Sequence, residues 1–252
     1  MFLLALTLAA GTGTVAAPTR VFAAFVSHNE EAASNPPCAP VVTGRERYLA
    51  NRAAVVTLAR AIVERNAAWD FQSEWQYLQA VQAWDDAAVT GATDGKNIAR
   101  YLAELSPSHL AVDAHSHERS GWNYADVAHL LAGLGVPPTG IVGGYIANPS
   151  SAETWTRLRQ PLRGLRAPYP TWQALALWGG GSANHRDDAR ASGVWRPLDP
   201  ERFFEDDPAQ ALFNIGGWTG EVATGELVWA TLPTMARVWR EEYGSQPSMV
   251  RP

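Results

Sequence analysis

The segment from Leu110 to Asp126 carries the densest set of reactive side chains in the chain. A short apolar run ending at Val112 leads into the sequence DAHSHE, which places His115 and His117 two residues apart. In extended backbone, residues i and i+2 point the same way, so both imidazoles can face one metal ion. The alternative is a polar loop that carries two histidines without a shared role. The spacing favours a metal or catalytic role.

Polar side chains also follow other apolar runs that are typical of buried strands. His28 and Glu30 follow the run 20–26, and Glu74 follows the run 69–72. The carboxyl ends of parallel strands meet at the same edge of a sheet, and α/β enzymes build their sites there. We therefore expect these side chains to form one site with the His-x-His segment.

The types of these residues indicate two kinds of hydrolytic chemistry. Three imidazoles, from His28, His115 and His117, predict a divalent metal site for Zn²⁺, or for Mn²⁺ or a similar ion. A metal so held activates water for hydrolysis of an ester, amide or phosphoester, with a carboxylate as the base. Without metal, two facing carboxylates suit glycoside hydrolysis. The candidate catalytic carboxylates for either chemistry are Glu30, Glu74 and Glu118.

The aromatic composition points to carbohydrate as the substrate or ligand. The chain has 11 Trp against 7 Phe and 7 Tyr, and flat indole faces beside polar groups suit sugar rings. Packing of the core is the alternative explanation for many of them. A non-catalytic glycan-binding barrel is accordingly a third hypothesis. The candidate substrate-binding residues are Asp70, Trp75, Trp122, Tyr124, Asn184, His185, Trp195 and Arg196.

The elements that position these residues alternate between strands and helices. Periodicity predicts strands at 20–26, 69–72, 110–112, 140–146, 192–197 and 212–218. It predicts helices at 46–65, 74–84, 97–105, 124–134, 151–158 and 225–243. This alternation is typical of an α/β fold with a mostly parallel sheet. We expect a single irregular βα barrel with its site at the C-terminal strand ends. An open, doubly wound sheet is the alternative.

Composition limits the class of protein and its partners. With 46% hydrophobic and 18% charged residues, the 252-residue chain can bury a sizeable core, and we expect a single domain over 18–252. A net charge of −5 without any basic block disfavours nucleic acid as a partner. The single cysteine excludes a cysteine zinc site and an internal disulfide. Oligomeric state is not indicated.

The N-terminal segment 1–17 is apolar and ends in small residues, which is typical of a secretory signal peptide. It is too short and too interrupted to span a membrane stably. We therefore expect export to the periplasm or the exterior. The alternative is a cytoplasmic protein whose start site is misassigned.

Three motifs together resemble the polysaccharide deacetylases. The stretch Ser27 to Glu31 stands where that family has an acidic pair after its first strand. The sequence His115-Ser116-His117 is similar to its histidine motif, and Trp195-Arg196-Pro197 to its aromatic-Arg-Pro motif. The resemblance spans roughly residues 20 to 220. It implies an irregular βα barrel that removes N- or O-acetyl groups from sugars with a divalent metal.

The same resemblance implies roles for individual residues. Glu30 would be the general base or a metal ligand, and His115 and His117 would be metal ligands. Arg196 would position the base, and His28 would replace a ligand that this sequence lacks. The glycine-rich stretch 179–185 has no Lys followed by Ser or Thr, so we reject a phosphate-binding loop.

Overall fold

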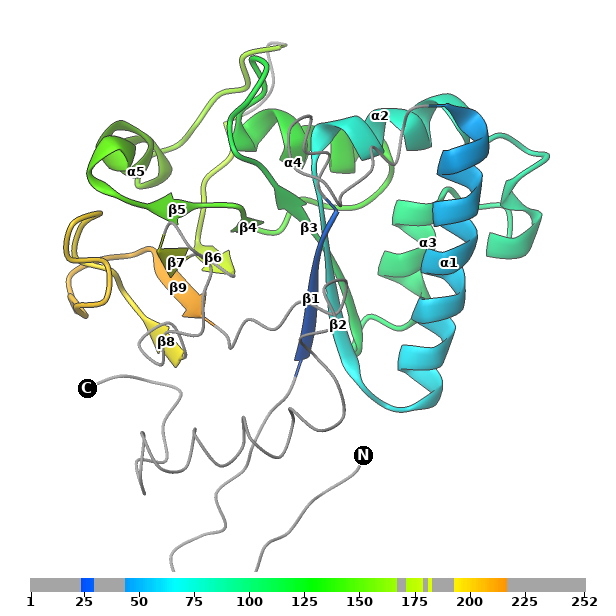
Figure 1. Ribbon diagram of the computed structural model, residues 1–252, viewed down its shortest axis with the longest axis horizontal. Coiled ribbons are helices and arrows are strands. Elements are labelled where there is room, and N and C mark those ends of the chain that lie inside the picture. Colours follow the sequence, from blue (N-terminus) through cyan, green and yellow to red (C-terminus); the bar gives the residue numbers. More distant parts are fainter. Residues whose placement is uncertain (1–23, 30–43, 167–170, 179–180, 183–192, 217–252) are drawn as a thin grey trace, which may run out of the picture.

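The computed structural model describes residues 24–29, 44–166, 171–178, 181–182 and 193–216. These residues form a mixed seven-stranded sheet with five α-helices, which confirms the predicted α/β class (Figure 1). The predicted signal segment 1–17, the predicted helix 225–243 and three candidate site residues, Glu30, Asn184 and His185, lie outside the described residues.

The main sheet has the strand order β1-β2-β3-β4-β6-β9-β8. Its strands are β1 (Ala24–Asn29), β2 (Ala68–Ser73), β3 (Leu110–His115), β4 (Ile141–Gly143), β6 (Ala176–Trp178), β9 (Phe213–Gly216) and β8 (Gly193–Trp195). Neighbours pair in parallel except β8, which is antiparallel to β9. A second, two-stranded sheet pairs β5 (Ile146–Ala147) with β7 (Gly181–Ser182). The prediction of a mostly parallel sheet is therefore confirmed.

The six parallel strands follow one another in chain order. A doubly wound sheet reverses its strand order beside the first strand, and no such reversal occurs among the described strands. An order that runs in one direction is the order of βα barrels. The described strands form a sheet that is not closed.

The five helices are α1 (Arg45–Glu64), α2 (Trp75–Trp84), α3 (Ile98–Leu105), α4 (Tyr124–Gly133) and α5 (Ala152–Leu158), with short 3₁₀ turns at Thr90–Thr93 and Pro149–Ser151. Asn97 caps α3 by accepting from the backbone N–H of Arg100, and Asn123 forms a capping box with Asp126 at α4. Among the described residues, no helix is long and apolar enough to cross a membrane.

The long predicted strand 140–146 is divided in the structure. β4 ends at Gly143, Gly144 has a φ of 91°, and β5 starts at Ile146. This left-handed conformation is open to glycine at no steric cost and turns the chain away from the main sheet. The interruption lies beside the end of β3.

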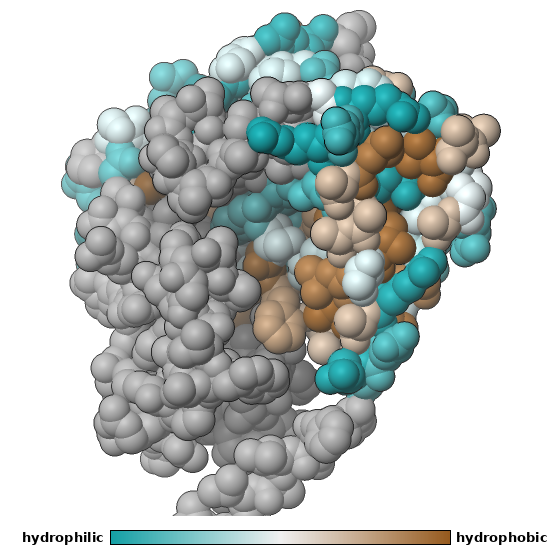
Figure 2. All heavy atoms as spheres, turned by 45° about the vertical axis from the view of Figure 1, so that its right-hand side comes forward, coloured by the Kyte–Doolittle hydropathy of each residue, from teal (hydrophilic) through white to brown (hydrophobic). Residues whose placement is uncertain are grey.

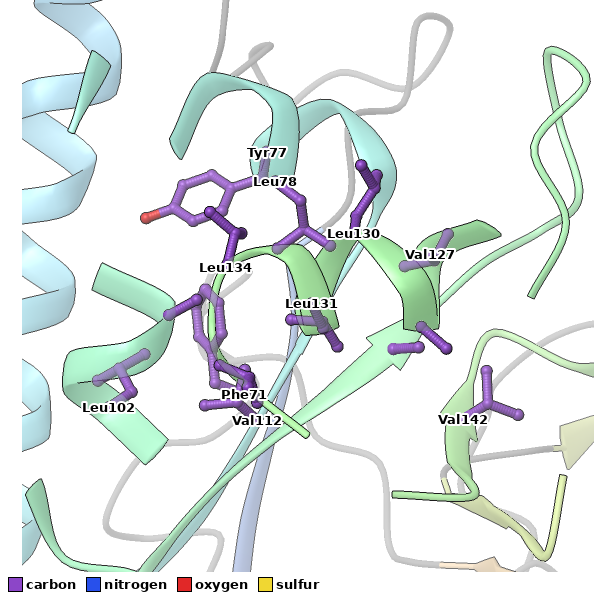
Figure 3. Close-up of a cluster of buried hydrophobic side chains, with 14 of the residues drawn as sticks. Phe71, Tyr77, Leu78, Leu102, Val112, Val127, Leu130, Leu131, Leu134 and Val142 are labelled. Carbon is purple, nitrogen blue, oxygen red and sulfur yellow. The ribbon is translucent and has the colours of Figure 1, made fainter. Parts of the chain in front are cut away.

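The two faces of β2 and β3 differ in character. One face carries Trp69, Phe71 and Val112, which pack with residues of the helices such as Leu102 and Leu131 in the main core (Figure 3). Helices α1 and α3 lie along this side of the first three strands (Figure 1). Alternate residues of the same strands form the opposite face, which includes four polar and fully buried side chains: Asp70, Gln72, Asp113 and His115.

A shallow apolar hollow lies on the outer side of α1. It is lined from α1 by Leu49, Ala53 and Val56, and from the connection between α2 and α3 by Val89 and Ala92. Figure 2, which brings this side forward, shows apolar residues gathered between polar ones. This surface lies on the helix layer, away from the polar face of the sheet.

Candidate metal centre

Glu74, His115 and His117 come together at the C-terminal ends of β2 and β3. One ligand atom from each lies within 4.8 Å of the other two. Glu74 and His115 are buried, and His117 is half-buried. The set contains a carboxylate and two imidazoles, which are the ligands that Zn²⁺ takes in catalytic sites with three protein ligands.

Local structure explains why these three side chains meet. Glu74 is the N-cap residue of α2 and directly follows β2, while His115 is the last residue of β3. The strands are parallel neighbours in register, with Ser73 opposite Ala114. Beyond the strand, the Ser116 N–H still donates to the Gly143 carbonyl, which continues the pairing of β3 with β4 by one residue. The structure thus brings the two rings together, as the His-x-His spacing predicts.

The distance between the two imidazoles matches a shared metal ion. His115 Nε2 and His117 Nε2 lie 3.3 Å apart. With Zn–N bonds of about 2.0–2.1 Å and a tetrahedral angle, two nitrogens on one Zn²⁺ are separated by about 3.3–3.4 Å. The donor set therefore fits Zn²⁺ in its chemistry, and the two imidazoles also fit it in their spacing. The same two atoms can share a hydrogen bond in which one ring donates to the other.

His28, predicted as a third metal ligand, lies beside this group. Its ring centroid is 4.3 Å from that of His115, with an interplanar angle of 42°. His28 is exposed, on the second-last position of β1. Among the described residues, the ligand set within 4.8 Å contains Glu74, which the sequence predicts as catalytic, in place of His28.

Two consecutive glycines make room for the His115 ring. A Cβ at Gly143 would lie 2.8 Å from His115 Nδ1 and would also collide with the Gln72 side-chain oxygen. A Cβ at Gly144 would lie 2.9 Å from His115 Nε2 and would collide with the Ser116 carbonyl. Any larger residue at either position would displace the imidazole.

A hydrogen-bonded set of buried polar residues lies on the sheet face behind His115. Gln72 Nε2 donates to Asp70 Oδ2 at 2.7 Å, and Thr139 Oγ1 donates to Asp113 Oδ1. Burial raises the pKa of both carboxyls, and the Asp113 charge helps raise that of Asp70 to about 8. This burial places Asp70, predicted to bind substrate, in the sheet interior.

Glu118, the third candidate catalytic carboxylate, is held by neighbouring side chains. Its Oε2 accepts hydrogen bonds from Arg157 and Thr154, and the Arg157 contact is an ion pair. Its φ of 53° lies in the left-handed region, which turns the chain after His117. Burial, followed by the Glu118 charge, raises the pKa of Tyr124 above its usual value. Glu118 and Arg157 thus form a charged border to the site.

The predicted aromatic residues divide into two groups. Trp75 directly follows Glu74, and Trp122 comes five residues after His117; their rings stack with centroids 5.0 Å apart and an interplanar angle of 5°. The Arg166 guanidinium lies 5.0 Å from the centroid of the Trp122 ring. Tyr124, on α4, is fully buried.

Trp195 and Arg196 lie elsewhere. Trp195 is fully buried on β8 and donates from Nε1 to the Phe203 carbonyl at 2.6 Å. Arg196 Nη1 donates to the Pro208 carbonyl at 2.9 Å, and Arg196 pairs with Asp206. In the sheet order, β8 is four positions from β3. Within the described residues, these contacts do not connect Trp195 or Arg196 to the Glu74–His115–His117 group.

The sequence interpretation missed Gln72 and the two glycines. Their signal was present in the alternation of β2, where Asp70, Gln72 and Glu74 occupy every second position and so share one face. The role of Gly143 and Gly144 depends on pairing between β3 and β4, which no local pattern encodes.

Comparisons with known proteins add no relative. No protein-family model matches the chain, no curated protein matches it, and no solved structure matches it.

Proposed function

We propose that this protein is a divalent metal-dependent hydrolase acting on carbohydrate, with a deacetylase-like removal of acyl groups from a polysaccharide. One observation carries the proposal: the 3.3 Å separation of His115 Nε2 and His117 Nε2, with a Glu74 oxygen within 4.8 Å of each. We further propose that the sheet, whose parallel strands run in chain order, belongs to an irregular βα barrel.

Zn²⁺ is the ion that the donor set favours, with Mn²⁺ as the next choice. Glu74, His115 and His117 would hold it, which leaves a fourth position open. When bound, the ion would lower the pKa of a water molecule and polarise an acyl carbonyl.

The surrounding residues would bind substrate and move the proton. His28 is exposed and its ring lies tilted beside that of His115, so its imidazole is placed to take or return a proton at the open side of the site. Trp75 is partly exposed and lies next to Glu74 in the chain, where an indole face suits a sugar ring. Glu118 is paired with Arg157, so we assign it a positioning role.

Release of acetate from acetylated chitooligosaccharide and acetylated xylan tests this function. The metal-stripped protein should be inactive, added Zn²⁺ should restore acetate release, and His117→Ala should remain inactive with Zn²⁺. Glycosidic cleavage that persists in chelator and is lost in Glu118→Gln would instead support a metal-free glycoside hydrolase. Glycan binding without bond cleavage under any metal would support a non-catalytic barrel.

A further inference from the structure

Gln72 lies in the middle of the polar sheet face, next to the candidate metal centre. It is fully buried and comes two residues before Glu74 on the same side of β2. Its register partner is Asp113, which precedes His115 by two residues on β3. Gln72 thus shares a face with two of the three candidate ligands.

The two ends of the Gln72 amide have different surroundings. Nε2 donates to Asp70 Oδ2 at 2.7 Å. Oε1 points the other way, across β3 to Gly143, where a Cβ would collide with it and would also lie 2.8 Å from His115 Nδ1. Gln72 Oε1 and His115 Nδ1 therefore border the same small space, which exists because residue 143 has no side chain.

The direction of the amide follows from its contact with Asp70. In the reverse orientation Oε1 would face Asp70 Oδ2, and two acceptor oxygens would meet wherever Oδ1 carries the Asp70 proton. Among the described residues, Gln72 Oε1 has no hydrogen-bond partner. A buried acceptor without a donor is costly, so an N–H directed at this oxygen would be stabilising.

We propose that Gln72 is a positioning residue for His115. The Nδ1–H tautomer of His115 would donate a hydrogen bond to this Oε1 across the space at Gly143, and that tautomer would direct the Nε2 lone pair to the metal. Histidine ligands commonly donate their second ring N–H in this way, and removal of the acceptor costs roughly 10–100-fold in metal affinity. The inference rests on the metal site proposed above and adds the device that orients its buried ligand.

Zn²⁺ affinity of Gln72→Met and Gln72→Glu tests this role. Both changes remove the donor to Asp70, and only Glu keeps an oxygen facing His115. By competition titration with a Zn²⁺ chelator, we expect Gln72→Met to weaken affinity roughly 10–100-fold and Gln72→Glu to recover most of the loss. Gln82→Met, an exposed position on α2, is the matched control and should bind as the wild type does.

The outcomes separate this inference from the proposed function. A wild type that binds no Zn²⁺ overturns both. A wild type that binds while Gln72→Met binds within twofold of it overturns only the role of Gln72. Should Gln72→Met fail to fold, a long-range ¹H–¹⁵N spectrum of the Zn²⁺-loaded wild type decides. A protonated His115 Nδ1 supports the inference, and a deprotonated Nδ1 overturns it.

Discussion

His115 Nε2 lies 3.3 Å from His117 Nε2, although the two residues differ in burial and the second lies beyond the end of β3. Both imidazoles lie on one side of the chain at the end of β3, and Glu74, directly after the parallel neighbour β2, adds its carboxylate. Three candidate ligands from two strand ends thus converge where parallel α/β sheets place their chemistry.

Removal of one ligand should weaken metal binding strongly. We expect Glu74→Gln to lower Zn²⁺ affinity by more than the roughly 10–100-fold typical of residues that only support a ligand. Titration of metal-stripped protein measures this. His109→Ala is the control: His109 lies just before β3, bonded to Asn66 and Ser106, and its loss should leave affinity unchanged. Equal affinity in Glu74→Gln and the wild type would remove Glu74 from the site.

Gly143→Ala should destabilise the fold and disturb the site together. Its Cβ would press on Gln72 and on the His115 ring, and overpacking of this kind costs about 1–3 kcal/mol. Gly133→Ala on α4 is the matched change, since its Cβ would meet only Gln82 Nε2, at 3.8 Å. Chemical denaturation should show a lower free energy of unfolding for Gly143→Ala and little change for Gly133→Ala. Equal stabilities would show that the space at Gly143 can relax.

Asp70 should make stability fall as pH rises. Its pKa is about 8 in the fold against an ordinary value near 3.8, so between these values the folded protein retains a proton that the unfolded chain releases. The free energy of unfolding therefore decreases from about pH 4 to pH 8. Asp70→Asn should flatten this part of the curve in the metal-free protein. An unchanged pH profile would mean that Asp70 is ionised in the fold.

Loss of the arginine from the buried Arg52–Asp85 ion pair should cost far more stability than its loss from the exposed Arg45–Asp86 pair. Arg52 Nε donates to Asp85 Oδ1 at 2.8 Å, and both side chains are buried. Arg52→Ala leaves a buried carboxylate without its cation, at a cost of about 3–5 kcal/mol. Arg45→Ala breaks the exposed pair with Asp86 and should cost less than about 1 kcal/mol. A similar decrease in the free energy of unfolding for Arg52→Ala and Arg45→Ala, measured in urea, would contradict this ranking.

Much of the helix layer could be predicted from local patterns. The helix predicted at 46–65 occupies Arg45–Glu64, and the helix predicted at 124–134 starts after its Asn123 cap as expected. These elements are determined by periodicity and capping residues that lie close together in the sequence. The His-x-His convergence was predictable for the same reason, because two residues of one extended segment carry it.

Features that depend on pairing between distant segments were not predictable. The place of Glu74 beside the histidines depends on the β2–β3 register, and the burial of Asp70 depends on what covers its sheet face. Trp195 is of a residue type that often binds sugars, yet its indole N–H donates to the Phe203 carbonyl in the core. The sequence predicted His28 as the third metal ligand, whereas the structure brings Glu74 to the two histidines. This difference also depends on how distant strands pair.

The most direct test of the metal centre is calorimetric titration of Zn²⁺ into the metal-stripped full chain. We expect one Zn²⁺ per chain in the wild type and no measurable binding in the His115→Ala, His117→Ala double variant, with both proteins folded by circular dichroism. Absence of binding in the wild type, or equal binding in the double variant, would contradict it.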